Sequence, residues 1–125
     1  MAPRPPSWAI SNTSNRIRFD EKSYVKATFK NYRDEDLIKV FEPLSDNTNV
    51  EIVRVITCKV GDASSRSMRK ALSENCYISE VAFRNCTMNP KRMKRILQGI
   101  VSNAEEGELV DLSFVDCNLD DRSAR

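Results

Sequence analysis

The chain has 125 residues, 40% of them hydrophobic, and a net charge of +2, which fits one small domain with a modest core. It contains no histidine, so the commonest general base and the commonest zinc ligand are missing. The charge is too small to indicate nucleic-acid binding by itself. No apolar run approaches the ~18–20 residues that span a bilayer. We therefore expect no membrane span, no metal site and no cofactor.

The first segment, residues 1–20, differs in composition from the rest of the chain. It holds three prolines and three arginines, and no acidic residue precedes Asp20. We expect a flexible basic arm over residues 1–20 and a folded domain over residues 21–125. The arm also resembles a mitochondrial presequence, although its prolines argue against a helix at its start. Trp8, its one large apolar side chain, is the residue through which the arm would dock.

Strand-like and helix-like stretches alternate after residue 20. Alternating apolar residues predict strands within 24–32, 50–60, 78–88 and 109–119. Apolar residues at helical spacing predict helices over 34–44, 62–75 and 89–103. Asn89 is a favourable N-cap, and Pro90 suits the first helical position. This order predicts parallel strands joined by right-handed crossovers.

Three of the strand-like stretches are copies of one repeat, which becomes visible when Cys58, Cys86 and Cys117 are aligned. Apolar residues stand eight, five and three positions before each cysteine and two positions after it. The copies are VEIVRVITCKV, ISEVAFRNCTM and LVDLSFVDCNL, with the pattern L-x-x-L-x-L-x-x-C-x-L. The cysteines are 28 residues apart (58 to 86) and 31 residues apart (86 to 117).

This pattern resembles the leucine-rich repeat family, in the longer form similar to ribonuclease inhibitor, over residues 21–125. The resemblance implies an α/β fold: a short solenoid of about three and a half repeats. Parallel strands would line its concave face and helices its convex face. Residues 24–32 form a weaker copy, as expected of a repeat that caps the end of a solenoid.

In this family the repeated cysteine turns inward, so we expect a buried structural row rather than a metal site or reactive thiols. Cys76, which ends a helix, is also expected to be buried. Reduced thiols suit an intracellular compartment. We therefore expect a cytoplasmic protein, with mitochondria as the alternative.

Side chains that alternate with the core positions face outward on the strands. On the concave face these include the candidate partner-binding residues Arg54, Ile56, Arg84, Asp111, Ser113 and Val115. The outward charges run from basic on the first strand to acidic on the last, which would orient a bound partner.

A second charged surface is predicted on the helix over 89–103. It carries Lys91, Arg92, Lys94 and Arg95. We interpret them as the solvated side of an amphipathic helix; nucleic acid is the less favoured partner, because no aromatic residue interleaves with them.

The last predicted strand would expose a free edge and a partly uncovered apolar face. Such an edge invites pairing with a capping subunit, a second copy of the chain or further repeats. We expect a non-catalytic protein–protein interaction module that binds through its concave face and this C-terminal edge. No side chain has the neighbours that catalysis requires, so we do not expect an enzyme. The alternative is a structural subunit of a large intracellular assembly, of mitochondrial, ribonucleoprotein or ciliary/cytoskeletal type.

Overall fold

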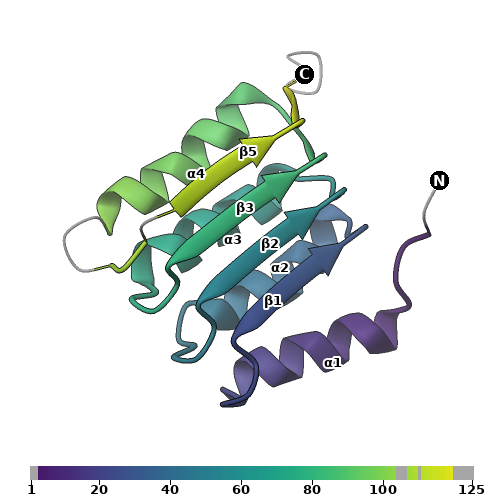
Figure 1. Cartoon of the computed structure of the whole chain (residues 1–125). Coiled ribbons are helices and arrows are strands. Elements are labelled where there is room, and N and C mark those ends of the chain that lie inside the picture. Colours follow the sequence, from purple (N-terminus) through teal and green to yellow (C-terminus); the bar gives the residue numbers. More distant parts are fainter. Residues whose placement is uncertain (1–2, 104–106, 110, 120–125) are drawn as a thin grey trace.

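The computed structural model describes residues 3–103, 107–109 and 111–119. One layer is a parallel sheet in the order β1-β2-β3-β5, and the other is a row of helices behind it (Figure 1). The strands are β1 (Lys26–Lys30), β2 (Ile52–Ile56), β3 (Glu80–Arg84) and β5 (Asp111–Val115). The helices are α1 (Ser7–Arg18), α2 (Asp34–Leu44), α3 (Asp62–Glu74) and α4 (Pro90–Ser102). Two short strands, β4 (Thr87–Met88) and β6 (Asn118–Leu119), pair where the chain leaves the main sheet.

The four long strands pair without any slip, so equivalent repeat positions lie in straight rows across the sheet. One inward row joins Ala27, Val53, Val81 and Leu112, and the next joins Phe29, Val55, Phe83 and Phe114. This is the alignment expected from the cysteine spacing. The predicted α/β solenoid, with strands on its concave face and helices on its convex face, is therefore confirmed.

Local sequence explains where the helices begin and how closely they pack. The side chain of Asn89 accepts a hydrogen bond from the Arg92 amide, and Pro90 is the first residue of α4, as predicted. Gly99 lies in the contact between α4 and α3, where an added Cβ would collide with the backbone of Arg69. A larger residue at this position would force the two helices apart.

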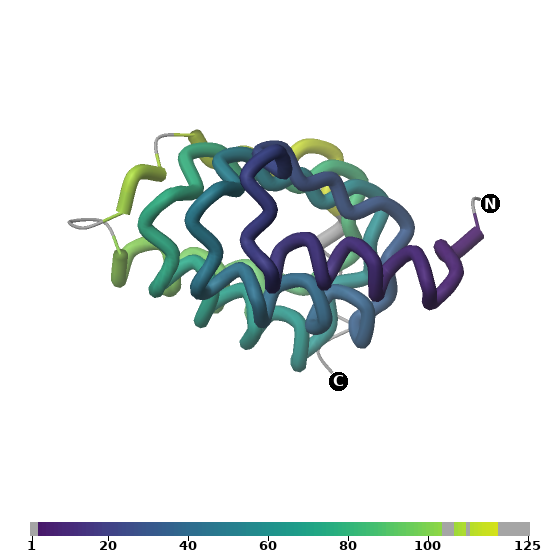
Figure 2. Tube along the Cα trace, turned by 90° about the horizontal axis from the view of Figure 1, so that it is seen from below, coloured from purple at the N-terminus to yellow at the C-terminus, as the bar shows by residue number. Residues whose placement is uncertain are grey.

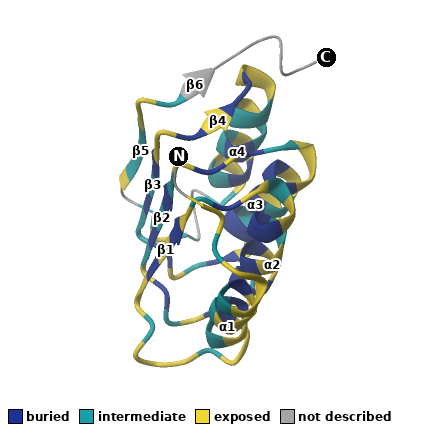
Figure 3. Cartoon of the chain, turned by 90° about the vertical axis from the view of Figure 1, so that its right-hand side faces the viewer, coloured by how far each residue is buried: buried dark blue, intermediate teal, exposed yellow. Residues whose placement is uncertain are grey.

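The core lies between the sheet and the helices, where the inner faces of both layers are buried (Figure 3). Its largest side chains include Phe29, Phe41 and Phe83, all fully buried. Strands β1, β2 and β3 alternate buried and accessible residues, so the period of two read from the sequence sets which face is covered.

The expected flexible arm is wrong, because residues 7–18 form α1, which lies along the N-terminal end of the solenoid (Figure 2). Ile10 and Ile17 are buried in the core, and the Ser14 hydroxyl donates to the Lys39 carbonyl of α2 at 2.7 Å. The prolines do not prevent this helix because all three precede it, with Pro6 as the N-cap. The boundary placed at residue 20 stays a prediction.

A left-handed residue follows every strand of the main sheet. Asn31, Thr57, Asn85 and Asp116 all have φ between 53° and 62°. Each immediately precedes the row that holds Tyr32 and the three repeat cysteines. Asparagine and aspartate tolerate this conformation better than other non-glycine residues, whereas β-branched Thr57 is strained there.

Candidate functional site

The candidate residues of the concave face lie together, on the side of the sheet away from the helices. A shallow depression is lined by Arg54 and Ile56 on β2, Arg84 on β3 and Ser113 on β5. Asp111 and Val115 are exposed at the two ends of β5. These residues share one face of the sheet, as strand alternation predicted, and their role in binding stays a prediction. Trp8, the predicted docking residue of the N-terminal segment, lies apart on α1.

Charges on this surface differ between its rows. The row at the start of the strands runs from Lys26 through Ile52 and Glu80 to Asp111, so it changes from basic to acidic. The row at the other end begins with Lys30 and is still basic at Arg84. Arg54 lies 3.6 Å from Glu80, which partly neutralises the middle of the face. The expected gradient is thus present in one row only.

The C-terminal end of the solenoid exposes residues of the core pattern. Leu109, Leu112 and Phe114 are half-buried, whereas the equivalent residues of the preceding repeat are buried. Phe114 stacks on Phe83 with ring centroids 4.9 Å apart, and its other face has no stacking partner among the described residues. The apolar surface continues onto α4, where Val101 is 73% exposed.

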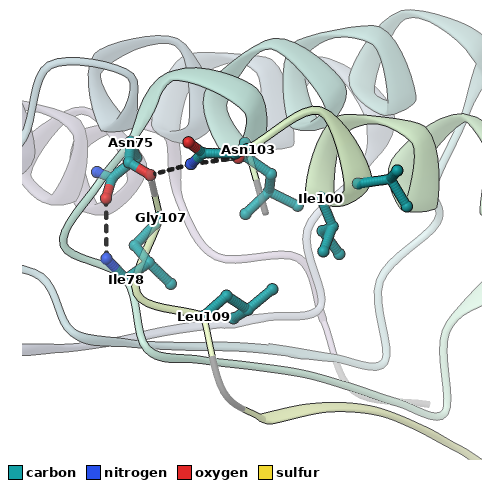
Figure 4. Close-up of a pocket in the computed structure, with 8 residues that line it drawn as sticks. Asn75, Ile78, Ile100, Asn103, Gly107 and Leu109 are labelled. Carbon is teal, nitrogen blue, oxygen red and sulfur yellow. Dashed lines mark hydrogen bonds between the residues drawn. The ribbon is translucent and has the colours of Figure 1, made fainter. Parts of the chain in front are cut away.

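A cavity opens at this end, between the last turn of α4 and the start of β5 (Figure 4). Ile78, Ile100 and Leu109 provide its apolar walls. The side-chain amide of Asn103 crosses it and donates to the carbonyl of Asn75 at 2.6 Å. The cavity suits an apolar side chain better than a charged ligand.

Asparagines at the helix ends form a repeating network that the sequence analysis missed. Asn47, Asn75 and Asn103 are 28 residues apart in each case (47 to 75, 75 to 103). Each side-chain amide follows one helix and donates to a backbone carbonyl at the end of the helix before it. Asn47 donates to Ile17 O of α1, Asn75 to Leu44 O of α2 and Asn103 to Leu72 O of α3. A search for a second constant spacing, besides that of the cysteines, would have found this row.

The last turn departs from this scheme. The side-chain oxygen of Asn75 accepts from the amides of Tyr77 and Ile78, and that of Asn47 accepts from Asn49 and Val50. Core residues follow after three positions in both cases, but Leu109 follows Asn103 after six. These three extra residues explain why the final cysteine spacing is 31 rather than 28.

Comparison with known proteins bears on this arrangement of strands, helices and repeating turns. The solved structure of the tropomodulin C-terminal domain of Caenorhabditis elegans is similar to this chain, with a TM-score of 0.72 and 12% sequence identity. The match covers 86% of this chain and 65% of that one. The fold is leucine-rich-repeat-like. No protein-family model matches the sequence, and no curated protein matches it.

The cysteines of this leucine-rich-repeat-like fold form the predicted inward row. Their Sγ atoms contact the carbonyl of the preceding strand, Cys58 with Phe29 O at 3.3 Å and Cys86 with Val55 O at 3.2 Å. A hydrogen bond with Cys58, together with burial, raises the pKa of the Cys86 thiol. Cys86 is therefore a poor nucleophile and a poor metal ligand. Thiols thus act here as weak donors that join neighbouring repeats.

Cys76 differs from the prediction because it is only half-buried. The preceding residue, Asn75, occupies the inward position of the turn, which leaves the Cys76 side chain on the outside. All four cysteines are free thiols.

The basic residues of α4 are partly engaged within the chain. Arg95 donates to Asp62 Oδ1 at 2.7 Å and to Ser65 Oγ at 2.9 Å on α3. Arg92 donates to the Val60 carbonyl at 3.3 Å. Of the four basic residues, only Lys91 and Lys94 are exposed. Two lysines make a weak site for nucleic acid.

None of the helices in the described residues is both long and apolar enough to cross a membrane. Within the same residues, no three side chains of the His, Cys, Asp or Glu types converge as metal ligands would.

Proposed function

We propose that this chain is a non-catalytic protein–protein interaction module that binds through its concave face and its C-terminal end. The observation that carries the proposal is the half-buried apolar end formed by Leu109, Leu112 and Phe114. In the part of the chain that the structure describes, β5 is the last strand of the sheet, and a strand edge beside partly exposed core residues is a surface that other chains cover. The partner is a protein because the surface offers backbone groups, apolar side chains and few charges. No observation favours the alternative, a structural subunit of a large assembly.

The concave face would add specificity to this contact. Ser113 and Val115 belong both to this face and to the last strand, so a partner paired with β5 would also meet the depression around Arg54, Ile56 and Arg84. Asp111 lies at the same edge and would favour a basic residue on the partner.

We also infer that the repeats are of the longer, ribonuclease-inhibitor-like type. Each interior repeat contains a full α-helix of 11 to 13 residues, which supports this inference. A cytoplasmic location is proposed on the basis of the free thiols, with mitochondria as the alternative.

The test adds charge to β5 without touching the core. Ser113→Lys and Val115→Lys are combined, and Thr28→Lys on β1 serves as the matched control at the opposite edge of the sheet. Proteins captured by the wild-type chain and by each variant are compared by quantitative mass spectrometry, and self-association is followed by sedimentation. We expect the double variant alone to lose its captured partners. Unchanged capture and unchanged sedimentation in the double variant would refute the proposal.

A further inference from the structure

The outer surface of α1 carries the two most exposed aromatic side chains among the described residues. Trp8 is 73% exposed and Phe19, at the C-cap of the helix, is 77% exposed. They are eleven residues apart, which on a helix is about three turns with an offset of only about 20°. Both therefore point the same way, opposite to the buried face of α1, and lie roughly 16 Å apart along the helix axis.

Two asparagines complete this stripe. Asn12 and Asn15 are exposed and lie between the aromatic residues on the same side of α1. The spacing is four residues from Trp8 to Asn12, three from Asn12 to Asn15 and four from Asn15 to Phe19. This alternation is that of the contact positions of a coiled coil, in which polar residues at the seam fix the register. We call Trp8, Asn12, Asn15 and Phe19 the outer stripe.

The outer stripe has the same order of residue types and the same spacings from either end: aromatic, asparagine, asparagine, aromatic. If a second α1 lies against it in the opposite direction, Trp8 meets Phe19 of the other copy and Asn12 meets Asn15 of the other copy. Aromatic residues then pack on aromatic residues, and amides face amides that supply both donors and acceptors. Such self-complementarity is what a two-fold symmetric interface requires.

Charge selects the antiparallel direction. The last turn of α1 is basic, with Arg16 and Arg18, and its first turn holds no acidic residue. Glu21 neutralises Arg16 at 2.6 Å, but Arg18 forms no ion pair within the described residues. Parallel helices would bring the two Arg18 side chains to the same end, whereas antiparallel helices separate them by the length of the helix. Antiparallel helix dipoles also attract one another.

We propose that α1 is a homodimer interface, in which two copies of the chain pair through antiparallel outer stripes. This surface lies at the N-terminal end of the solenoid, remote from the C-terminal end that carries the proposed function (Figures 1 and 2). A dimer would therefore leave both C-terminal ends and both concave faces accessible, and it would make each chain bivalent.

Trp8 is the only tryptophan of the chain, so its fluorescence reports directly on this contact. We expect the wild-type chain to change from monomer to dimer with concentration in sedimentation equilibrium, and its emission to shift to the blue in parallel. Trp8→Lys and Phe19→Glu should each weaken the dimer at least tenfold. Both side chains are exposed, so at concentrations where the wild-type chain is monomeric the melting temperatures should not change.

Paired charges test the direction of the helices. In the antiparallel arrangement, W8K/F19E brings opposite charges together and W8K/F19K brings like charges together. The first variant should associate at least tenfold more tightly than the second at low salt, and the difference should vanish at high salt. Tyr77→Lys changes another exposed aromatic residue, 51% accessible, and should leave the dimer intact.

Each of the following outcomes would overturn the proposal. One is a wild-type chain that stays monomeric at millimolar concentration. Another is a dimer that survives both single substitutions, or in which W8K/F19E and W8K/F19K associate equally. The last is a monomer whose Trp8 emission shifts only when vesicles of phosphatidylcholine and phosphatidylserine are added, which would make the outer stripe a lipid-binding surface.

Discussion

The inward side chains of the first and the last strand occupy the same rows of the sheet but differ in how far they are buried. At the N-terminal end, α1 packs against α2, and the inward side chains of β1, Ala27 and Phe29, are fully buried. At the C-terminal end, the inward side chains of β5, Leu112 and Phe114, are half-buried although they occupy the same rows of the sheet. Burial in a repeat protein thus depends on the next unit as much as on the residue.

The N-terminal end contributes mainly contacts that stabilise the chain, whereas the C-terminal end offers apolar surface for an interaction. The N-terminal end, here called the closed end, is held to the rest of the chain by the contact between α1 and α2. Arg4 adds to this, because its guanidinium pairs with the buried Asp36. Among the described residues, the C-terminal end leaves apolar area accessible to water, and binding of another surface would remove that area from water. Substitutions at equivalent positions of interior and terminal repeats therefore test this comparison.

The largest expected effect is that of Phe83→Ala, an interior substitution. Phe83 is fully buried, so its loss should lower the free energy of unfolding by about 3–5 kcal/mol. Phe114→Ala, one strand further on, should cost only about 1–2 kcal/mol because its ring is already half-exposed. Urea unfolding measures both values. Equal costs would mean that the C-terminal end is covered as fully as the interior.

The second largest loss of stability is expected from substitutions of the asparagines at the helix ends. Asn75→Ala removes a buried amide that donates to Leu44 O and Asn47 O and accepts from two backbone amides. We expect a loss of about 2–4 kcal/mol, because these groups lose their partners away from water. Asn103→Ala, at the C-terminal end, should cost about 1 kcal/mol. Thermal unfolding of the two variants side by side would reveal whether the interior turn is the more important.

The closed end should show a pH dependence of its own. Burial tends to raise the pKa of Asp36, but hydrogen bonds from Arg4 and from the Arg33 amide outweigh it, so the pKa is lowered. A carboxyl group with a lowered pKa stabilises the fold above its unfolded value, about 3.9, and stops doing so as the pH falls through its folded value. Asp36→Asn should therefore lower the melting temperature at pH 7, with a difference that shrinks below pH ~4. A difference that is independent of pH would exclude this ion pair as its cause.

The smallest effect is a gain. Thr57 is exposed and has a φ of 53°, a conformation that the equivalent residues Asn31 and Asn85 tolerate better. Thr57→Asn should raise the free energy of unfolding by about 1 kcal/mol, since it relieves strain without changing the core. Asn85→Thr should cost a similar amount. Equal stability of all three proteins in urea would show that the left-handed row is not strained at Thr57.

The rows of the sheet could be predicted because apolar residues recur at constant offsets from Cys58, Cys86 and Cys117. A repeated pattern is averaged over copies, so single departures such as Met88 do not hide it. The cap residue Asn89 and the helix after it were also predictable, since capping depends on local hydrogen bonds.

Helix α1 could not be predicted in the same way. Its buried face has only two apolar residues, Ile10 and Ile17, and a single helix without a second copy offers no repeat to average. The concave surface could be predicted because strand alternation fixes which side chains point outward. The cavity beside Leu109 could not, because it depends on how the end of α4 packs against the segment before β5 rather than on any residue type.

The reactivity of the thiols in the cysteine row can report local unfolding of the solenoid. Cys58 and Cys86 are buried inside the stack, while Cys117 belongs to the last described repeat and is half-buried. A thiol reagent can reach the first two only when the solenoid comes apart, but it can reach Cys117 through fraying of the last repeat alone. The rates of labelling along the row therefore map how far fraying travels inward. Any partner that covers the C-terminal end would slow the labelling of Cys117 first.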